Sequence, residues 1–234
     1  MTVIAMTREM GSRGKEVAAG LAAEMDLEVV HHELVAQHVC ERIGIQESSV
    51  HRFLEGRSYL WERWNLDEKR LSRFTADEIL QLAFRGNVII RGWGAAHLLA
   101  DIPHVLCARV CAPMENRIDE MVDRLNEAAW EAAKPIEHSP AFVREAMRVT
   151  RDDARREVEL SDRAHAKVIL KQFGKDWQDA LHYDVVLNTG RMSISDCIKQ
   201  LRSLTRSEDY RPTDSSLQIL KDRLTETNND AALV

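Results

Sequence analysis

Residues 2–17 read TVIAMTREMGSRGKEV, an apolar run followed by a glycine-containing segment and the start of an amphipathic stretch. Apolar residues continue after Lys15 at helical spacing, namely Val17, Ala18, Leu21, Ala22 and Met25. This order predicts a strand over residues 2–6, then a turn and a helix. In such a unit the backbone N–H groups of the turn and the amino end of the helix converge on a phosphate. Lys15 would add a mobile positive charge, and Arg8 and Arg13 two more.

The segment departs from the general phosphate-binding loop pattern G-x-x-x-x-G-K-[ST] at two positions. Gly14 and Lys15 fit the end of the pattern, but Glu9 stands where the first glycine belongs. Glu16 replaces the hydroxyl residue that holds Mg²⁺ in that pattern, although Ser12 could supply a hydroxyl from within the loop. Two interpretations therefore stay open: a phosphate-binding loop, and an ordinary glycine turn between a strand and a helix.

The rest of the chain alternates strand-like and helix-like segments. Strand-like runs lie at 27–30, 88–90, 105–110 and 183–188, and helical patterns separate them. This alternation predicts an α/β fold with a mostly parallel five-stranded sheet and helices on both faces. The loop at Gly14, the turn at 91–94 and the strand end near Ala112 then share the sheet edge where ligands bind. Their convergence favours the phosphate-binding interpretation.

We expect one α/β domain over residues 1–204, with a helical insertion at about 46–85 and a helical lid at about 139–173. Residues 205–234 are expected to form a C-terminal helical tail. The tail is polar and contains a short amphipathic pattern around Leu217, Leu220 and Leu224.

Composition and charge narrow the classes of protein. The 234 residues carry a net charge of −6, which argues against broad nucleic-acid binding because that usually needs a clustered basic face. No run approaches the roughly 18 to 20 apolar residues of a membrane span, and the first residues lack a basic-plus-apolar signal segment. We therefore expect a cytoplasmic protein without nucleic-acid or membrane partners. The four cysteines are expected to be reduced thiols: Cys40, Cys107, Cys111 and Cys197.

Four segments together resemble one known family. Residues 7–17 read TREMGSRGKEV, residues 89–95 IIRGWGA, residues 173–179 FGKDWQD and residues 183–190 YDVVLNTG. They are similar to S-R-E-[YF]-G-S-G-G-[RK]-E-[IV], V-I-V-G-R-G-A, F-G-x-D-W-x-D and Y-D-[LV]-V-[IL]-N-T-G. These are motifs of the cytidylate kinase-like family of P-loop nucleoside monophosphate kinases. The resemblance spans about residues 1–200 and is specific through the combination of its motifs.

The resemblance implies a P-loop kinase-like three-layer fold with a helical lid. It also implies transfer of the γ-phosphoryl group of ATP, assisted by Mg²⁺, to a nucleoside monophosphate, with CMP or dCMP as the first candidates. It places Lys15 among the catalytic residues and makes Ser12 the metal ligand. The loop residues implied to bind the nucleotide are Arg8, Gly11, Ser12, Arg13, Gly14, Lys15 and Glu16. The implied catalytic arginines of the lid are Arg151, Arg155 and Arg156. The acceptor candidates are Arg91, Trp93, His97, Arg117 and Asp162.

Several of these residues also have a structural interpretation. Arg155 and Arg156 are adjacent and cannot point the same way on a helix, so one would contact phosphate while the other pairs with a nearby acid. Alternatively, both belong to a solvated charged face. Arg117 would approach the nucleotide or form a surface ion pair with the acids between 119 and 123. His97 would reach an acceptor phosphate or serve only to hold the structure.

The sequence differs from the family at the acceptor pocket. Trp93 stands where the family has an arginine, His165 where a D-x-x-R pattern has its arginine, and His31 where an acid is common. These differences keep two alternatives open: a phosphotransferase with a non-nucleotide acceptor, and a nucleotide-binding or sensing protein that has lost turnover. A nucleotide is the expected ligand in each case, and a homodimer is left open.

Overall fold

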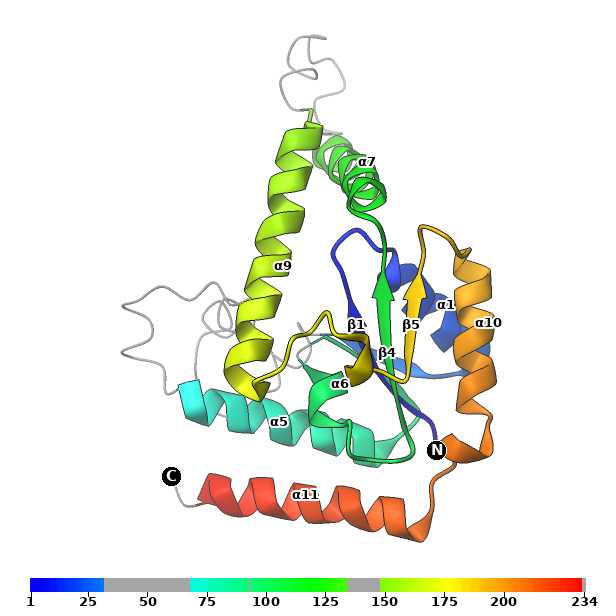
Figure 1. Ribbon diagram of the computed structural model, residues 1–234, viewed down its shortest axis with the longest axis vertical. Helices are drawn as coiled ribbons and strands as arrows, with labels where there is room; N and C mark the ends of the chain where they lie inside the picture. Colours follow the sequence, from blue (N-terminus) through cyan, green and yellow to red (C-terminus); the bar gives the residue numbers. More distant parts are fainter. Residues whose placement is uncertain (32–67, 93, 134–147, 233–234) are drawn as a thin grey trace.

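The computed structural model describes residues 1–31, 68–92, 94–133 and 148–232. Most of the expected helical insertion, Trp93 and the first part of the expected lid, residues 139–147, lie outside the described residues. Within these ranges the chain forms a five-stranded sheet with helices on both faces (Figure 1).

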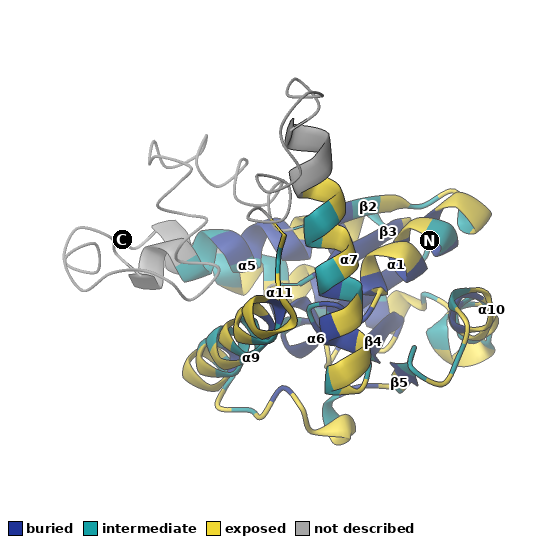
Figure 2. Cartoon of the chain, turned by 90° about the horizontal axis from the view of Figure 1, so that it is seen from above, coloured by how far each residue is buried: buried dark blue, intermediate teal, exposed yellow. Residues whose placement is uncertain are grey.

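All neighbouring strands of the sheet run parallel, in the spatial order β2-β3-β1-β4-β5. The strands are β1 (Val3–Arg8), β2 (Glu28–His31), β3 (Val88–Arg91), β4 (Val105–Cys111) and β5 (Val185–Asn188). The three central strands are buried along almost their whole length, as expected for strands that helices cover on both sides (Figure 2). The predicted mostly parallel five-stranded α/β sheet is confirmed.

Alternate residues of the strands supply two separate cores, one on each face of the sheet. Helices α1 (Gly14–Met25) and α10 (Ile194–Thr205) cover one face, where Leu21 and Leu201 share a core with Ile4. Helices α5 (Glu68–Arg85), α6 (Ala95–Leu98) and α11 (Asp214–Ala232) cover the other face, where Ile79 shares a core with Ala5. The layers follow the three-layer order expected from the sequence (Figure 1).

Two long helices pack together near the carboxyl end of β4: α7 (Met114–Ala133) follows β4 and extends beyond it, and α9 (Arg151–Phe173) runs from α7 back towards α5 (Figure 1). Thr150 and Asp153 form a reciprocal capping box at the start of α9, and Gly174 ends the helix in the left-handed conformation, with a φ of 65°. A third, small core between the two helices contains Ile118 and Val158. Helix α9 therefore forms the described part of the expected lid.

The C-terminal segment takes part in the packing of the domain. A 3₁₀ turn, η3 (Glu208–Tyr210), leads from α10 to α11, which lies along α5 (Figure 1). Leu220 of α11 is fully buried in the core that β1 and β3 share. The hydroxyl of Ser216 lies 2.8 Å from Nδ1 of the buried His104, and Arg223 forms an ion pair with Asp101. The helix expected in a tail thus covers part of the main core.

Two expectations from composition can be compared with the structure. The described cysteines, Cys107, Cys111 and Cys197, are free thiols. Burial raises the pKa of Cys107 to about 12, which makes this thiol inert at neutral pH. Among the helices that the structure describes, none is both long and apolar enough to cross a membrane.

Candidate phosphate-binding site

The predicted phosphate-binding loop joins β1 to the first residue of α1, Gly14. Gly11 in this loop has a φ of 75°, a backbone conformation that favours glycine. A Cβ at this position would also overlap the carbonyl oxygen of Arg117, so a larger residue would not fit. Arg13 precedes α1 in a left-handed conformation, and its side chain makes no capping hydrogen bond. Because the first N–H groups of a helix have no partner within the helix, the amino end of α1 is open to an anion.

The exposed charges at this helix end favour phosphate binding. Lys15 is exposed in the first turn of α1 and makes no hydrogen bond or ion pair with the described residues. Arg13 is also exposed, with its Nε 3.7 Å from a carboxylate oxygen of Glu120. Glu16 is exposed beside Lys15. The open helix end and the unpaired ammonium group are what a polyphosphate requires.

The side chain of Ser12 turns into the protein. It is fully buried, and its Oγ donates a 2.8 Å hydrogen bond to the carbonyl oxygen of Glu9. This placement does not support Ser12 as a magnesium ligand, because the hydroxyl closes the loop internally and does not reach solvent. Within the described ranges, no group of three or more His, Cys, Asp or Glu side chains is placed to hold a metal ion.

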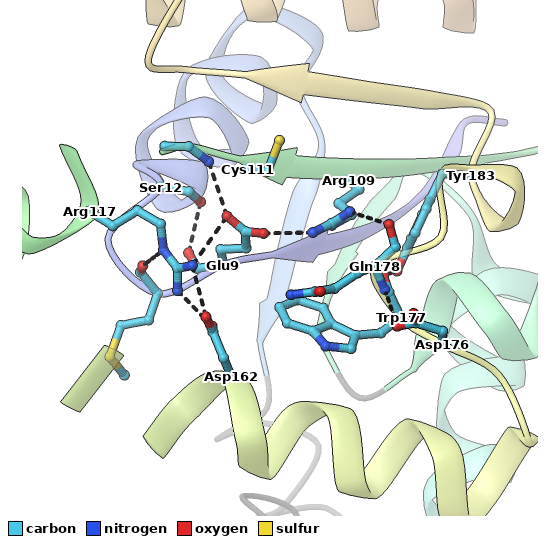
Figure 3. A network of polar contacts seen from close by, with 12 residues as sticks. Glu9, Ser12, Arg109, Cys111, Arg117, Asp162, Asp176, Trp177, Gln178 and Tyr183 are labelled. Carbon is cyan, nitrogen blue, oxygen red and sulfur yellow. Dashed lines mark hydrogen bonds and ion pairs between the residues drawn. The ribbon is translucent and has the colours of Figure 1, made fainter. Parts of the chain in front are cut away.

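Glu9, which replaces the first glycine of the general pattern, is a buried, ion-paired residue (Figure 3). Its Oε1 accepts a 2.6 Å hydrogen bond from Nη2 of Arg109, and its Oε2 accepts a 3.1 Å bond from the backbone N–H of Ala112. Nη1 of Arg117 lies 3.4 Å from the same Oε2. The carboxylate therefore ties the start of the loop to the ends of β4 and α7.

Arg109 connects this ion pair to the segment that follows α9. Its Nη1 donates a 2.8 Å hydrogen bond to the carbonyl oxygen of Gln178, and its guanidinium carbon lies 5.2 Å from the ring centroid of Trp177. The Trp177 ring also lies against the ring of His165 of α9, at a centroid distance of 4.8 Å. Sequence reasoning did not single out Arg109. A charged residue inside an apolar strand run is the signal that could have found it.

Arg117 does not form the surface ion pair that was one of the two arrangements expected for it. Its side chain is buried and donates two hydrogen bonds to Asp162 of α9, from Nη1 at 2.9 Å and from Nη2 at 2.6 Å (Figure 3). Its Nε donates a 2.7 Å bond to the carbonyl oxygen of Met10. The expected surface ion pair with residues 119–123 is wrong, because Arg117 points inward between the loop and α9. Arg117 and Asp162, both expected at the acceptor, are thus brought together.

The three arginines expected in the lid lie beside carboxylates. Arg151 pairs with Glu115 and Asp119 of α7, and Arg155 pairs with Glu115 at 2.7 Å. Hydrogen bonds from Arg155 and Arg151 lower the pKa of Glu115. Arg156 is exposed and lies 3.6 Å from Asp153 of its own helix. The first two arginines thus join α9 to α7.

Arg8 differs from these three arginines, because the charged groups near it are mainly other arginines. It ends β1 and makes no hydrogen bond or ion pair with the described residues. Burial, together with the positive charges of Arg91 and Arg124, lowers the pKa of Arg8 to about 10, against a smaller opposite effect of Glu16. Arg91 belongs to the same sheet face, since it pairs in register with Met6 of β1. The site therefore contains a cluster of positive charge beside the loop.

His97 lies in an apolar contact between α6 and the end of α9. Its ring centroid lies 5.6 Å from those of Phe173, His182 and Tyr183. Its Nε2 lies 3.4 Å from the hydroxyl of Tyr183, and its buried Nδ1 has no partner among the described residues. Burial, with His182, Lys175 and His165 nearby, lowers the pKa of His97 to about 4. The ring is therefore neutral at pH 7, which matches the structural interpretation of this residue.

Comparison with known proteins identifies the family to which this site belongs. Residues 3–191 match the cytidylate kinase-like family. The chain belongs to this family. No curated protein matches the sequence.

Solved structures similar to this member of the cytidylate kinase-like family include an uncharacterised protein from Eubacterium ventriosum. It has a TM-score of 0.63 and 16% identity, over 89% of this chain and 100% of that chain. A shikimate kinase from Bacteroides thetaiotaomicron has a TM-score of 0.49 and 11% identity, over 88% and 99% of the two chains. A sugar kinase from a Janibacter species has a TM-score of 0.44 and 14% identity, over 87% and 93%.

Membership of the cytidylate kinase-like family supports a kinase-type phosphotransfer on this parallel α/β sheet. The family match covers the loop, the turn after β3 and α9. ATP as the phosphoryl donor, usually with Mg²⁺, is what the family implies.

Proposed function

We propose that the protein transfers the γ-phosphoryl group of ATP to a nucleoside monophosphate, with CMP and dCMP as the first acceptors to test. The products would be ADP and a nucleoside diphosphate. An oxygen of the acceptor phosphate attacks the γ-phosphorus, and the bond from that phosphorus to the bridging oxygen of ADP breaks. Family membership supports the reaction class.

The donor half of the proposal rests on the loop at the start of α1. The open amino end of this helix and the exposed ammonium group of Lys15 fit the β- and γ-phosphates of ATP. Mg²⁺ would neutralise part of the phosphate charge. The exposed carboxylate of Glu16 is an oxygen ligand that the chain offers beside the loop, whereas the hydroxyl of Ser12 is buried.

The acceptor half rests on one observation, the cationic cluster around Arg8. An arginine that is largely removed from water and has no described carboxylate partner carries a cost unless an anion neutralises it. Arg91 and Arg124 add to the same charge. An acceptor that brings its own phosphate group supplies this anion, and a neutral hydroxyl acceptor does not. This favours a nucleoside monophosphate over a sugar-like acceptor.

Catalysis on this proposal is positioning plus electrostatic stabilisation, because phosphoryl transfer needs no covalent intermediate and no strong base. Lys15 and the N–H groups at the end of α1 hold the transferring group. The cluster around Arg8 holds the acceptor phosphate close to it. We assign no direct role to Arg151 and Arg155, because carboxylates of α7 already bind them.

The test is an acceptor screen with the purified protein, ATP and Mg²⁺, in which ADP formation and the phosphorylated product are both measured. We expect turnover with a nucleoside monophosphate, highest with CMP or dCMP. The acceptors compared are nucleoside monophosphates, the matching nucleosides, shikimate and simple sugars. Turnover with a nucleoside but not with its monophosphate would contradict the proposal. ATP binding without transfer to any acceptor would instead indicate a nucleotide-binding protein that has lost turnover.

A further inference from the structure

Arg117 contacts the phosphate-binding loop at consecutive residues. Its Nε donates to the carbonyl oxygen of Met10, and its Nη1 faces the carboxylate of Glu9. Its own carbonyl group lies against Gly11, at the place where a side chain at that position would be. With 4% of its side chain exposed, Arg117 forms part of the wall on which the loop rests.

These contacts set the direction of the N–H groups in the loop. In a trans peptide, the C=O of one residue and the N–H of the next point in opposite directions, and no described peptide is cis. Because the C=O of Met10 points at Arg117, the N–H of Gly11 points away from it. The C=O of Glu9 accepts from the N–H and the hydroxyl of Ser12, which turns the N–H of Met10 away from Ser12 in the same manner. Arg117 therefore orients a backbone donor of the candidate donor site.

The opposite side of Arg117 is bound to the lid helix. Both oxygens of Asp162 accept hydrogen bonds from its guanidinium group, and this two-point geometry fixes the orientation of α9 relative to Arg117 (Figure 3). The Met10 side chain also packs against the small core between α7 and α9. The loop is thus connected to α9 through Arg117, which pairs with Asp162, and through the apolar side chain of Met10.

From this arrangement we propose that Arg117 is a positioning residue for the donor site. Asp162 of the lid helix acts on catalysis through Arg117 and not by contacting the acceptor. The inference rests on the phosphoryl transfer proposed above and deepens it, since it gives the lid helix a way to set the geometry of the donor loop.

The other described ion pairs between α7 and α9 do not connect α9 to the donor loop. Arg151 and Arg155 bind Glu115 and Asp119 at the exposed surface, with about half of each arginine side chain in solvent. Those pairs join the two helices without reaching the loop. The Asp162 side chain is only 18% exposed and both of its oxygens face Arg117, so little of the carboxylate faces solvent, where an acceptor would bind.

The first test is Asp162→Asn, with Asp152→Asn on the same helix as the matched control. We expect Asp162→Asn to weaken binding of a non-hydrolysable ATP analogue by about tenfold, because a charge-assisted pair that orients the loop is lost. The KM for ATP should rise and kcat should fall, while the KM for the acceptor changes less than about twofold. Asp152→Asn, which changes an exposed residue of α9, should leave all three values unchanged.

The second test is a double-mutant cycle with Arg117→Lys. If Asp162 acts through Arg117, then the double variant should be no worse than Arg117→Lys alone, within about threefold. Asp162→Glu keeps the charge and should restore part of the affinity for the ATP analogue. This conservative variant also replaces Asp162→Asn in the binding assay if the asparagine variant does not fold.

Three outcomes would overturn the inference. The first is a raised acceptor KM with unchanged affinity for the ATP analogue in Asp162→Asn, which would place Asp162 at the acceptor. The second is additive losses in the cycle with Arg117→Lys. The third is behaviour of Asp162→Asn equal to that of Asp152→Asn. Because analogue binding needs no turnover, failure of the proposed reaction and failure of this coupling are distinguishable.

Discussion

Glu9→Gln gives a quantitative test of the buried ion pairs under the loop. The carboxylate of Glu9 is 7% exposed and neutralises Arg109 at 2.6 Å, with Arg117 at 3.4 Å. A glutamine of the same shape has one acceptor oxygen, so its NH₂ group would face a donor, either Arg109 or the backbone N–H of Ala112. Removing one partner of a buried pair typically costs about 3–5 kcal/mol. We expect a loss of about 3 kcal/mol in the free energy of unfolding.

The assay is urea denaturation followed by circular dichroism. With an m value of about 2–3 kcal/mol/M, the midpoint should fall by roughly 1 to 1.5 M while m stays constant. The matched control is Glu24→Gln. Glu24 pairs with Arg202 at almost the same distance, 2.7 Å, but is 41% exposed. An exposed pair contributes about 0–1 kcal/mol, so the control midpoint should move by less than about 0.4 M. Equal shifts in the two variants would refute the reasoning that burial gives the Glu9 network its strength.

Three further predictions concern the C-terminal helix, the buried histidine and the acceptor site. Leu220→Ala should lower the free energy of unfolding by about 3 kcal/mol in the same urea assay, because the Leu220 side chain is fully buried. The control Leu181→Ala should change the free energy of unfolding by less than about 0.5 kcal/mol, because Leu181 is 89% exposed. The pKa of His97 is lowered from 6.5 to about 4, so the unfolded chain binds the extra proton in this interval and the protein loses stability as the pH falls through it. Melting curves from pH 7 to pH 4 should therefore show a smaller loss of stability for His97→Gln than for the unchanged protein, the difference being no more than roughly 3 kcal/mol. An equal loss of stability in the two proteins would contradict this prediction. Arg8→Gln should raise the KM of the nucleoside monophosphate by more than about tenfold and the KM of ATP by much less, and the reverse pattern in steady-state kinetics would place Arg8 at the donor.

The sheet and the loop were predictable from the sequence because their signals are local. The apolar run at 88–90 and the helical spacing after Lys15 each lie within a few residues, and they decide strand and helix directly. The parallel order follows from the alternation of these elements. Gly11 and Gly14 then mark the turn between β1 and α1.

The polar partners of the site were not predictable, because they depend on which elements meet in space. Arg117 has acids of its own helix nearby in the sequence, yet it binds Asp162, 45 residues further along the chain. Arg155 likewise binds Glu115 of α7, 40 residues earlier in the chain. Helical spacing indicates which residues share a helix face, but it carries no information about the facing helix.

The sequence also could not predict the direction in which the side chains of the loop point. The pattern marks Ser12 as a residue with a hydroxyl group, but the turn of the backbone at Gly11 and Arg13 directs that group inward. In the same way, Glu9 was noted as a departure from the general pattern, and only the approach of β4 and α7 makes it an internal counter-ion.

In the proposed reaction, the amino end of α1 and the ammonium group of Lys15 bind the phosphates of ATP. Calorimetric titration with a non-hydrolysable ATP analogue and Mg²⁺ tests it most directly, on the unchanged protein, on Lys15→Ala and on the control Lys221→Ala. We predict one binding site in the unchanged protein and in the control. For Lys15→Ala we predict binding weaker by at least about 100-fold, with an unchanged melting temperature. Equal affinity of all three proteins for the analogue, or no binding to the unchanged protein, would contradict the claim.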